Sequence, residues 1–216
     1  MSHSVHPYSF RLGIIRDWKS RWFNMKKYTK FLREDILIRE WLEKKMRGMY
    51  VESIDIERAP NLLNIIIKTS RPGIVIGRKG EGIEKLKKEI SKMLSKLKSE
   101  EAGELKVTIE EVVSPESKAA IVAQMMIEGL EKRMSFRRLL KQTIEKIASN
   151  KDVEGVKIML SGRLDGAEMS RREWLKKGRI PLQTLRADID FAKDKAHMSY
   201  GDIGIKVWIY RGERFE

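Results

Sequence analysis

The sequence predicts an α+β fold in two domains, and three observations carry this prediction. The length of 216 residues exceeds that of one average domain. Segments with a hydrophobic period of two follow segments with helical spacing in both halves. Between the halves, Ser114-Pro115-Glu116 is typical of a helix start. We therefore expect a basic aromatic arm over residues 1–33, a first domain over 34–113 and a second over 114–216.

The chain is strongly basic. Lys and Arg number 45 against 31 Asp and Glu, a formal net charge of +14, which favours a polyanionic partner such as nucleic acid. Cysteine is absent, which excludes disulfides, thiolate metal sites and a cysteine nucleophile, and fits a reducing cytoplasm. The longest apolar run, Leu62 to Ile67, is far shorter than the roughly 20 residues of a membrane helix. We therefore expect a soluble protein with no membrane partner.

The arm combines cations with aromatic rings. Residues 16–33 contain seven basic residues and one acid, interleaved with Trp18, Trp22, Phe23 and Tyr28. Cations pair with phosphates while rings stack on bases, but the same rings could instead hold the arm on the first domain's core, and both readings stay open. The arm residues expected to contact RNA are Arg11, Arg16, Lys19, Arg21, Lys26 and Lys27.

The first domain reads as a helix over 35–46, two strands over 51–57 and 62–69, a short helix, a long helix after residue 82 and a strand over 105–112. A turn containing Pro60 joins the two strands. The long helix carries apolar residues at spacings of three and four.

Between the short and long helices lies Val75-Ile76-Gly77-Arg78-Lys79-Gly80. Glycine has no Cβ, so a phosphate can approach the main chain, and the start of the next helix favours an anion. This loop and the order of elements resemble a KH domain of the second type, whose Gly-x-x-Gly loop clamps the backbone of about four nucleotides. The resemblance implies that Gly77, Arg78, Lys79 and Gly80 form an RNA-binding loop.

Other phosphate loops fit less well. A P-loop requires Lys and then Ser or Thr after its last glycine, but Gly80 is followed by Glu81. A dinucleotide fingerprint starting at Gly80 requires a small residue where Lys85 stands. A glycine-rich turn with a solvated basic pair remains the alternative. No cofactor is expected.

The second domain reads as two helices, from Ser114 to about Lys132 and over 136–149, covering a mainly antiparallel sheet with strands over 155–161, 185–191 and 203–210. Basic side chains from one turn of the second helix share a surface: Arg137, Arg138 and Lys141. The stretch 171–186 is predicted as a basic loop containing Trp174. Further candidate RNA contacts are Arg163, Arg171, Arg172, Lys176, Lys177 and Arg179. A solvated charged face is the alternative for these groups.

Over its whole length the chain resembles the bacterial type of the small-subunit ribosomal protein three family. The matching segments, in order, are Val5-His6-Pro7 with Arg11-Leu12-Gly13-Ile14, Arg71 to Gly80, Phe136-Arg137-Arg138, Ser161-Gly162-Arg163-Leu164 with Gly166-Ala167-Glu168, Leu185 to Asp190, and Tyr200-Gly201 before Ile203 to Ile209. Many bacterial relatives continue into a basic tail beyond the position of Glu216, so no contacts of such a tail are carried over. The turn from Lys98 to Glu104 is longer and more acidic than usual.

The resemblance implies a non-enzymatic protein of the cytoplasmic small ribosomal subunit. It would lie in the subunit head, bind ribosomal RNA and help to position and unwind messenger RNA where the message enters. Arg137, Arg138 and Lys141 match the residues that face the incoming message. Ribosomal proteins ten and fourteen are the implied neighbours, with proteins four and five near that path.

Two other classes are weighed. Asp188 and Asp190 stand two apart on a predicted strand and could hold a metal ion in a nuclease, although such pairs more often meet neighbouring basic residues. No nucleophile and base accompany them, so neither catalysis nor a metal site is expected. A free-standing KH regulator is disfavoured because regulators often repeat the module, and the chain has no internal repeat.

Overall fold

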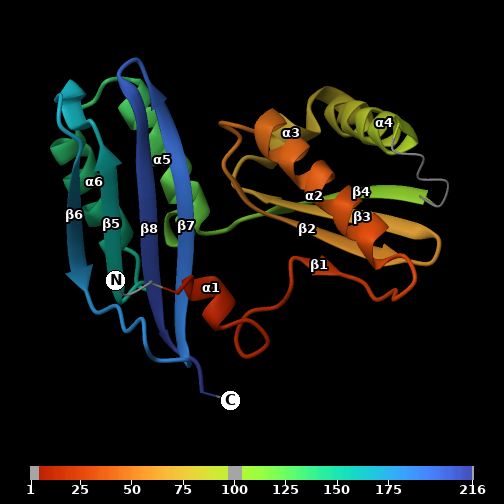
Figure 1. Ribbon diagram of the computed structural model, residues 1–216, viewed down its shortest axis with the longest axis horizontal. Coiled ribbons are helices and arrows are strands. Elements are labelled where there is room, and N and C mark those ends of the chain that lie inside the picture. The colour runs from red at the N-terminus through yellow and green to blue at the C-terminus, as the bar shows by residue number, and fades with distance from the viewer. Residues whose placement is uncertain (1–4, 97–103, 216) are drawn as a thin grey trace. The chain divides into compact units, whose positions relative to one another are not determined.

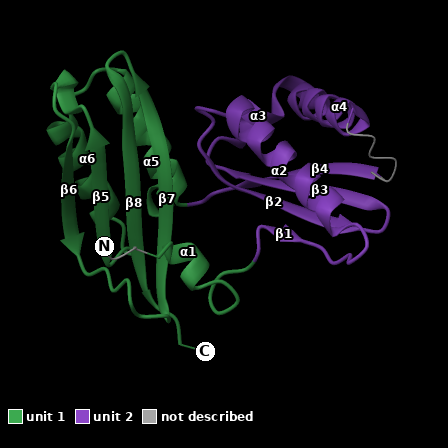
Figure 2. Cartoon of the chain, in the orientation of Figure 1, with its two compact units in different colours: residues 1–17, 114–216 green, residues 18–113 purple. Residues whose placement is uncertain are grey.

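A computed structural model describes residues 5–96 and 104–215 (Figure 1). The chain divides into two compact units, which are described separately. Unit 1 comprises residues 1–17 and 114–216, and unit 2 comprises residues 18–113 (Figure 2). The stretch predicted as one arm is thus divided after Asp17. The predicted turn from Lys98 to Glu104 lies, apart from Glu104, outside the described residues.

In its described residues, 18–96 and 104–113, unit 2 is a mixed four-stranded sheet in the order β1-β2-β3-β4 with three helices. β2 and β3 form an antiparallel hairpin, whereas β1 and β4 run parallel to their neighbours. The strands are β1 (Ser20–Arg21), β2 (Val51–Ala59), β3 (Leu62–Thr69) and β4 (Glu104–Glu111). The helices are α2 (Tyr28–Lys45), α3 (Pro72–Ile76) and α4 (Glu81–Lys96). This order confirms the predicted sequence of helices and strands.

The core of unit 2 joins α2 and α4 to the sheet. Leu86, Ile90 and Leu94 are buried at a spacing of four along α4, as its helical period predicts. Ile65 and Ile67 alternate on β3 and are fully buried against the helices.

Helix α2 begins at Tyr28, seven residues before the predicted start at Asp35. Trp22 explains the difference, because its indole N–H donates to Asp35 at 2.8 Å while its ring contacts the rings of Tyr28 and Phe31. Arg58 binds the same carboxylate at 2.6 Å. Tertiary contacts therefore extend the helix beyond its periodic segment.

Unit 1 is a four-stranded antiparallel sheet in the order β6-β5-β8-β7. Helix α5 packs on β7 and β8 and α6 on β5 and β6, so both helices cover one face, behind the sheet in Figure 1. The strands are β5 (Gly155–Gly162), β6 (Arg171–Gly178), β7 (Ala187–Met198) and β8 (Gly201–Glu213). The helices are α1 (Pro7–Phe10), α5 (Ala119–Glu131) and α6 (Phe136–Ala148). The predicted arrangement of two helices on an antiparallel sheet is confirmed.

Two predictions for this unit were wrong. The segment predicted as a loop over 171–186 begins with β6, an edge strand whose residues are exposed or half-buried and therefore show no apolar alternation. Helix α5 begins at Ala119 rather than at Ser114, and its cap comes from the sheet, because the Ala119 N–H donates to Asp190 Oδ2 at 2.8 Å. The hydroxyl of Ser114 instead pairs with that of Ser117.

Arg11 anchors the N-terminal segment within unit 1. Its guanidinium is fully buried and donates to the carbonyl oxygens of Pro7, Leu182 and Thr184 at 3.0, 3.0 and 2.9 Å. The ring of His6 lies edge-on against that of Phe191 at 4.7 Å. The segment is therefore a structural part of this unit and not a free arm.

Candidate nucleic-acid interface

The loop from Gly77 to Gly80 has a backbone that depends on glycine. Gly77 ends α3 with φ of +71°, and Gly80 has φ of +83°, a region that side chains with a Cβ rarely adopt. Between them Lys79 also has a positive φ, +52°, which is uncommon for a residue other than glycine. Arg78 and Lys79 are exposed, so the loop presents two cations beside a main chain that carries little bulk.

Gly82 is a further requirement of this loop, which the sequence reasoning missed. A Cβ at Gly82 would lie 2.4 Å from the carbonyl oxygen of Val75 and 2.7 Å from that of Ile76. The last turn of α3 therefore packs directly on the first turn of α4. Only glycine permits this approach, which fixes the two helices on either side of the loop. The sequence signal was the third glycine in Gly77-Arg78-Lys79-Gly80-Glu81-Gly82.

The charge around the loop is mixed. Glu81 and Glu84 lie in the first turn of α4, where carboxylates interact favourably with the positive end of the helix dipole. They also oppose an incoming phosphate, and Glu81 is partly balanced by Lys85 at 3.6 Å. Attraction of an anion at this loop must therefore come mainly from Arg78 and Lys79 rather than from the helix end.

A second basic group lies on α6. Arg137, Arg138 and Lys141 are all exposed, as their positions within one helical turn predict. The hydrophobic residues of the same helix, including Leu140 and Ile144, are buried against the sheet, so the basic residues occupy its outer surface.

Strand β6 brings a further cation beside this helix. Glu173 lies 3.8 Å from Arg137 and 3.4 Å from Arg171, and both guanidinium groups lie over the ring of Phe136, at 5.6 and 5.4 Å. The two predicted RNA-contact regions of this unit therefore meet here. We call Arg137, Arg138, Lys141 and Arg171 the α6–β6 basic surface.

The remaining predicted cations of β6 are distributed between the two faces of the strand. Arg172 and Lys176 alternate with Arg171 and Lys177, so they project to the face opposite the helices. Arg172, Lys176, Lys177 and the following Arg179 are all exposed. Arg163 is half-buried and its Nε donates to the carbonyl oxygen of Ala167 at 2.9 Å, which holds it locally.

Two cations of the predicted arm have structural roles. Arg11 is fully buried, so the prediction that it contacts RNA was wrong for this conformation: carbonyl oxygens occupy its donors. Burial also lowers the pKa of Arg11. Arg16 is largely buried and binds Asp188 at 2.5 Å. Neither guanidinium is a ready phosphate ligand.

The other arm cations lie in unit 2. Arg21, on β1, pairs with Glu57 at 2.9 Å, and the backbone N–H groups of Lys26 and Lys27 donate to the side-chain oxygen of Asn24. Lys19 contributes its carbonyl oxygen to the N–H of Ile56 at 2.8 Å. The side chains of Lys19, Arg21 and Lys26 are exposed and that of Lys27 is half-buried.

Some of the aromatic rings in the predicted arm pack on the domain and others are exposed, so each of the two interpretations applies to some of them. Trp22 packs within unit 2, as described above, whereas Trp18 is 63% exposed and Phe23 is 88% exposed. The exposed rings offer stacking surface, and the packed ring holds the segment on the domain.

The aspartates considered as metal ligands are engaged in ion pairs. Asp188 binds Arg16 and Arg214, the latter at 3.0 Å, and Asp190 binds Arg211 at 3.1 Å in addition to capping α5. Across residues 5–96 and 104–215, no cluster of three or more His, Asp or Glu side chains could hold a metal ion. Within the same ranges no helix is long and apolar enough to cross a membrane.

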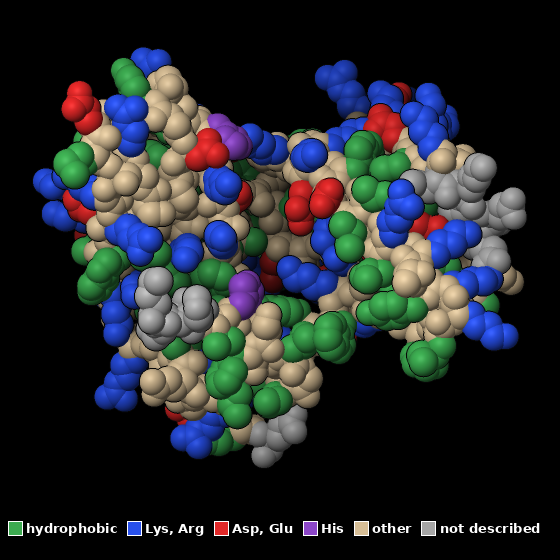
Figure 3. Space-filling view, viewed as in Figure 1, with side chains coloured by type: hydrophobic (Ala, Val, Ile, Leu, Met, Phe, Trp, Pro, Cys, Tyr) green, Lys and Arg blue, Asp and Glu red, His purple; other side chains and the backbone are tan. Residues whose placement is uncertain are grey.

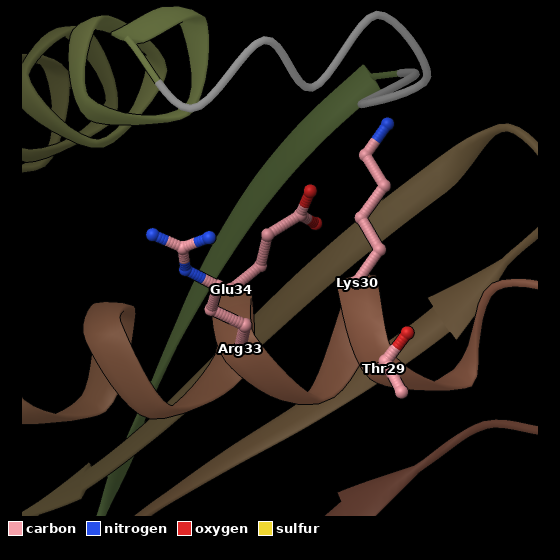
Figure 4. A pocket seen from close by; sticks show the side chains of 4 residues that line it. All are labelled: Thr29, Lys30, Arg33 and Glu34. Atoms are coloured by element: carbon pink, nitrogen blue, oxygen red, sulfur yellow. The ribbon is translucent and has the colours of Figure 1, made fainter.

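A small pocket lies beside α2, lined by Thr29, Lys30, Arg33 and Glu34 (Figure 4). One oxygen of Glu34 accepts from Arg58 at 2.8 Å, and its other oxygen is buried with no hydrogen-bond partner among the described residues. The pocket's single carboxylate is thus held in an ion pair with Arg58.

The fold of unit 2 and the basic surfaces of both units define an RNA-binding protein of the KH class. A KH domain model matches residues 37–117, and the model described as "Ribosomal protein S3, C-terminal domain" matches residues 126–209. The chain belongs to the family of small ribosomal subunit protein uS3. It is 48% identical over its full length to that protein of Endomicrobium trichonymphae, covering 90% of the relative. It is 47% identical over 99% of its length to that of Caldicellulosiruptor saccharolyticus, covering 93%.

Family membership confirms the resemblance drawn from the sequence. The chain is a ribosomal protein of the small subunit with an RNA-binding KH domain and an S3 C-terminal domain.

Proposed function

We propose that this chain, as a component of the head of the cytoplasmic small subunit, binds ribosomal RNA and guides messenger RNA where the message enters. The observation that carries the second part is the α6–β6 basic surface. Three exposed cations on one helical turn and a fourth from the adjacent strand can neutralise successive phosphates of one strand.

The same surface supports a role in unwinding structured messages. Cations that hold a single strand by its phosphates favour the open form of a hairpin over the paired form, because only the open strand can follow them through a narrow path. This work requires binding energy alone, and we propose no catalytic step for the chain. Ribosomal proteins ten and fourteen are the proposed neighbours, with proteins four and five close to the message.

The first experiment is sedimentation of tagged protein from its native host through sucrose gradients at low and high salt, with identification of the bound RNA. We expect stoichiometric, salt-resistant migration with small subunits. A slowly sedimenting pool that carries assorted transcripts would instead indicate a free-standing regulator.

The role at the message path is tested in reconstituted subunits carrying Arg137→Ala, Arg138→Ala and Lys141→Ala together. We expect translation through a stable hairpin to slow several-fold, with little change on an unstructured message. Lys146→Ala with Lys151→Ala is the control, because these exposed lysines lie outside the α6–β6 basic surface. Equal slowing on both messages would contradict a role in unwinding.

The Gly77–Gly80 loop is tested by Arg78→Asp with Lys79→Asp in the full chain. Loss of two phosphate contacts should weaken RNA binding and reduce the slope of log affinity against log salt by about 1.4 for a single strand. Fluorescence anisotropy at several salt concentrations measures both quantities. An unchanged slope would assign the phosphate contacts to other surfaces.

A further inference from the structure

The sheet of unit 1 has a second face that α5 and α6 do not cover, although His6, at the start of α1, packs on Phe191 at its β7 edge. Residues directly opposite each other on antiparallel strands project to the same face, so the register identifies which side chains share it. Val156, Ile158 and Leu160 of β5 are fully buried in the core shared with the helices, so the alternate positions of β5 and their cross-strand partners form the open face.

This open face is basic across all four strands. Its cations are Lys157 on β5, Arg172 and Lys176 on β6, Lys193 and Lys195 on β7, and Lys206 on β8. No ion pair to any of these six occurs among the described residues. Carboxylates on this face include Asp202, which His197 binds at 2.7 Å, and Glu213, which lies opposite Ala187 and pairs with Arg186. In Figure 3, Lys and Arg side chains outnumber acidic ones on this side of the unit.

Aromatic rings lie among these cations. Lys157 places its ammonium 5.0 Å from the ring of Trp174 and 5.3 Å from that of Trp208, and Phe191 continues the row at 5.3 Å from Trp208. Trp174 is 59% exposed, although tryptophan side chains are on average largely buried. It lies on an edge strand, so a ligand can approach its ring from the strand's free side.

We propose that the open face binds a single-stranded segment of RNA, with a base stacked on Trp174 and phosphates held by Lys157, Lys193 and Lys206. Unpaired cations over four strands match a polyanion, and an exposed indole beside them matches an unstacked base. A duplex offers no free base to the indole. This face lies on the opposite side of the sheet from α6, so it is separate from the α6–β6 basic surface.

The inference rests on the proposed RNA-binding function and adds a site to it. Arg172 and Lys176 were predicted RNA contacts, but the lysines of β5, β7 and β8 were not. The signal for them was present in the sequence as alternation: Lys193 and Lys195 stand two apart, as do Lys206 and Trp208.

The test measures binding of a labelled single-stranded oligouridine to the full chain by fluorescence anisotropy. Trp174→Ala should weaken binding roughly 5- to 100-fold, the range for loss of one stacked base. Trp174→Phe should retain most of the affinity, because its ring can still stack. Lys193→Ala with Lys206→Ala should reduce the salt slope by about 1.4. Lys146→Ala with Lys151→Ala, which removes the same charge elsewhere in the unit, should leave the slope within a few tenths of wild type.

The outcomes separate this inference from the proposed function. If wild type binds RNA and enters subunits, but Trp174→Ala and the Lys193–Lys206 pair bind oligouridine as wild type does, the open face is not an RNA site and the proposed function stands. If these variants lose a protein neighbour while keeping oligouridine affinity, the face binds protein and the inference is overturned. If wild type neither binds RNA nor sediments with subunits, the proposed function itself fails.

Discussion

Replacement of Gly82 by alanine tests how the Gly77–Gly80 loop is held. The added Cβ would lie 2.4 Å from the carbonyl oxygen of Val75, about 1.0 Å closer than the 3.4 Å at which ordinary contact begins. Both atoms that it meets belong to the backbone, so relief requires α3 and α4 to move apart. Overpacking of this kind costs about 1–3 kcal/mol.

Gly73→Ala is the matched control. Gly73 lies inside α3 and has open space around its missing Cβ, so alanine there should stabilise the helix by about 0.5–1 kcal/mol. The two variants thus make the same Gly→Ala change on neighbouring helices, and the expected changes in stability have opposite signs.

Hydrogen–deuterium exchange with mass spectrometry reports the effect locally in the full chain. Peptides from α3 and the first turns of α4 should exchange about ten-fold faster in Gly82→Ala for a loss of about 1.4 kcal/mol, and more slowly than wild type in Gly73→Ala. Affinity for single-stranded RNA should fall with the first variant only. Wild-type exchange and affinity in Gly82→Ala would refute the reasoning that this contact fixes the loop.

Three further predictions concern unit 1. Arg11→Met should lower the free energy of unfolding of unit 1 by about 3 kcal/mol, because the fully buried guanidinium donates to three carbonyl oxygens that would lose a charged donor. Urea denaturation measures this loss, with hydrogen exchange in β7 as the local readout, and a loss below about 1 kcal/mol would contradict the prediction. Asp190→Ala should fray the first turn of α5 and cost about 1–2 kcal/mol, seen as faster exchange of the Ala119 amide, whereas unchanged exchange would mean that the cap is dispensable. Burial, with the nearby carboxylates of Glu154 and Glu213, raises the pKa of Tyr210, so its folded pKa lies above the unfolded value of about 10. The associated stability is present below that pH and is lost as the pH rises through the folded pKa; Tyr210→Phe should flatten this alkaline decline in urea titrations, and an identical decline in the variant would assign it to other groups.

The elements that the sequence predicts well are those whose signal is local. The stripe of Leu86, Ile90 and Leu94 defines α4, and the loop between Gly77 and Gly80 is recognisable from its glycines and its position before a helix. The apolar residues of β3 and β5 likewise predict strands, because their pattern matches burial on one or both faces of a sheet.

The features that local patterns missed depend on distant partners. The sequence did not predict strand β6, because an exposed edge strand needs no alternation of apolar residues. Its strand conformation depends instead on backbone pairing with β5. Arg11 reads as one more cation of a basic arm, since the carbonyl oxygens that bury it belong to residues 182 and 184. The side chain that caps α5 is Asp190, which lies 71 residues after Ala119, so no motif near Ser114 could predict it.

The discontinuous make-up of unit 1 has a consequence for a chain emerging from its own synthesis. Residues 18–113 form one uninterrupted unit and can complete their contacts as soon as they are made. Arg11 is made before all of them, yet two of its acceptors follow 171 and 173 residues later. The segment from Pro7 to Asp17 therefore cannot make its contacts with Leu182, Thr184 and Asp188 until those residues are made. A nascent chain halted before Ala187 would carry a finished unit 2 and an open unit 1.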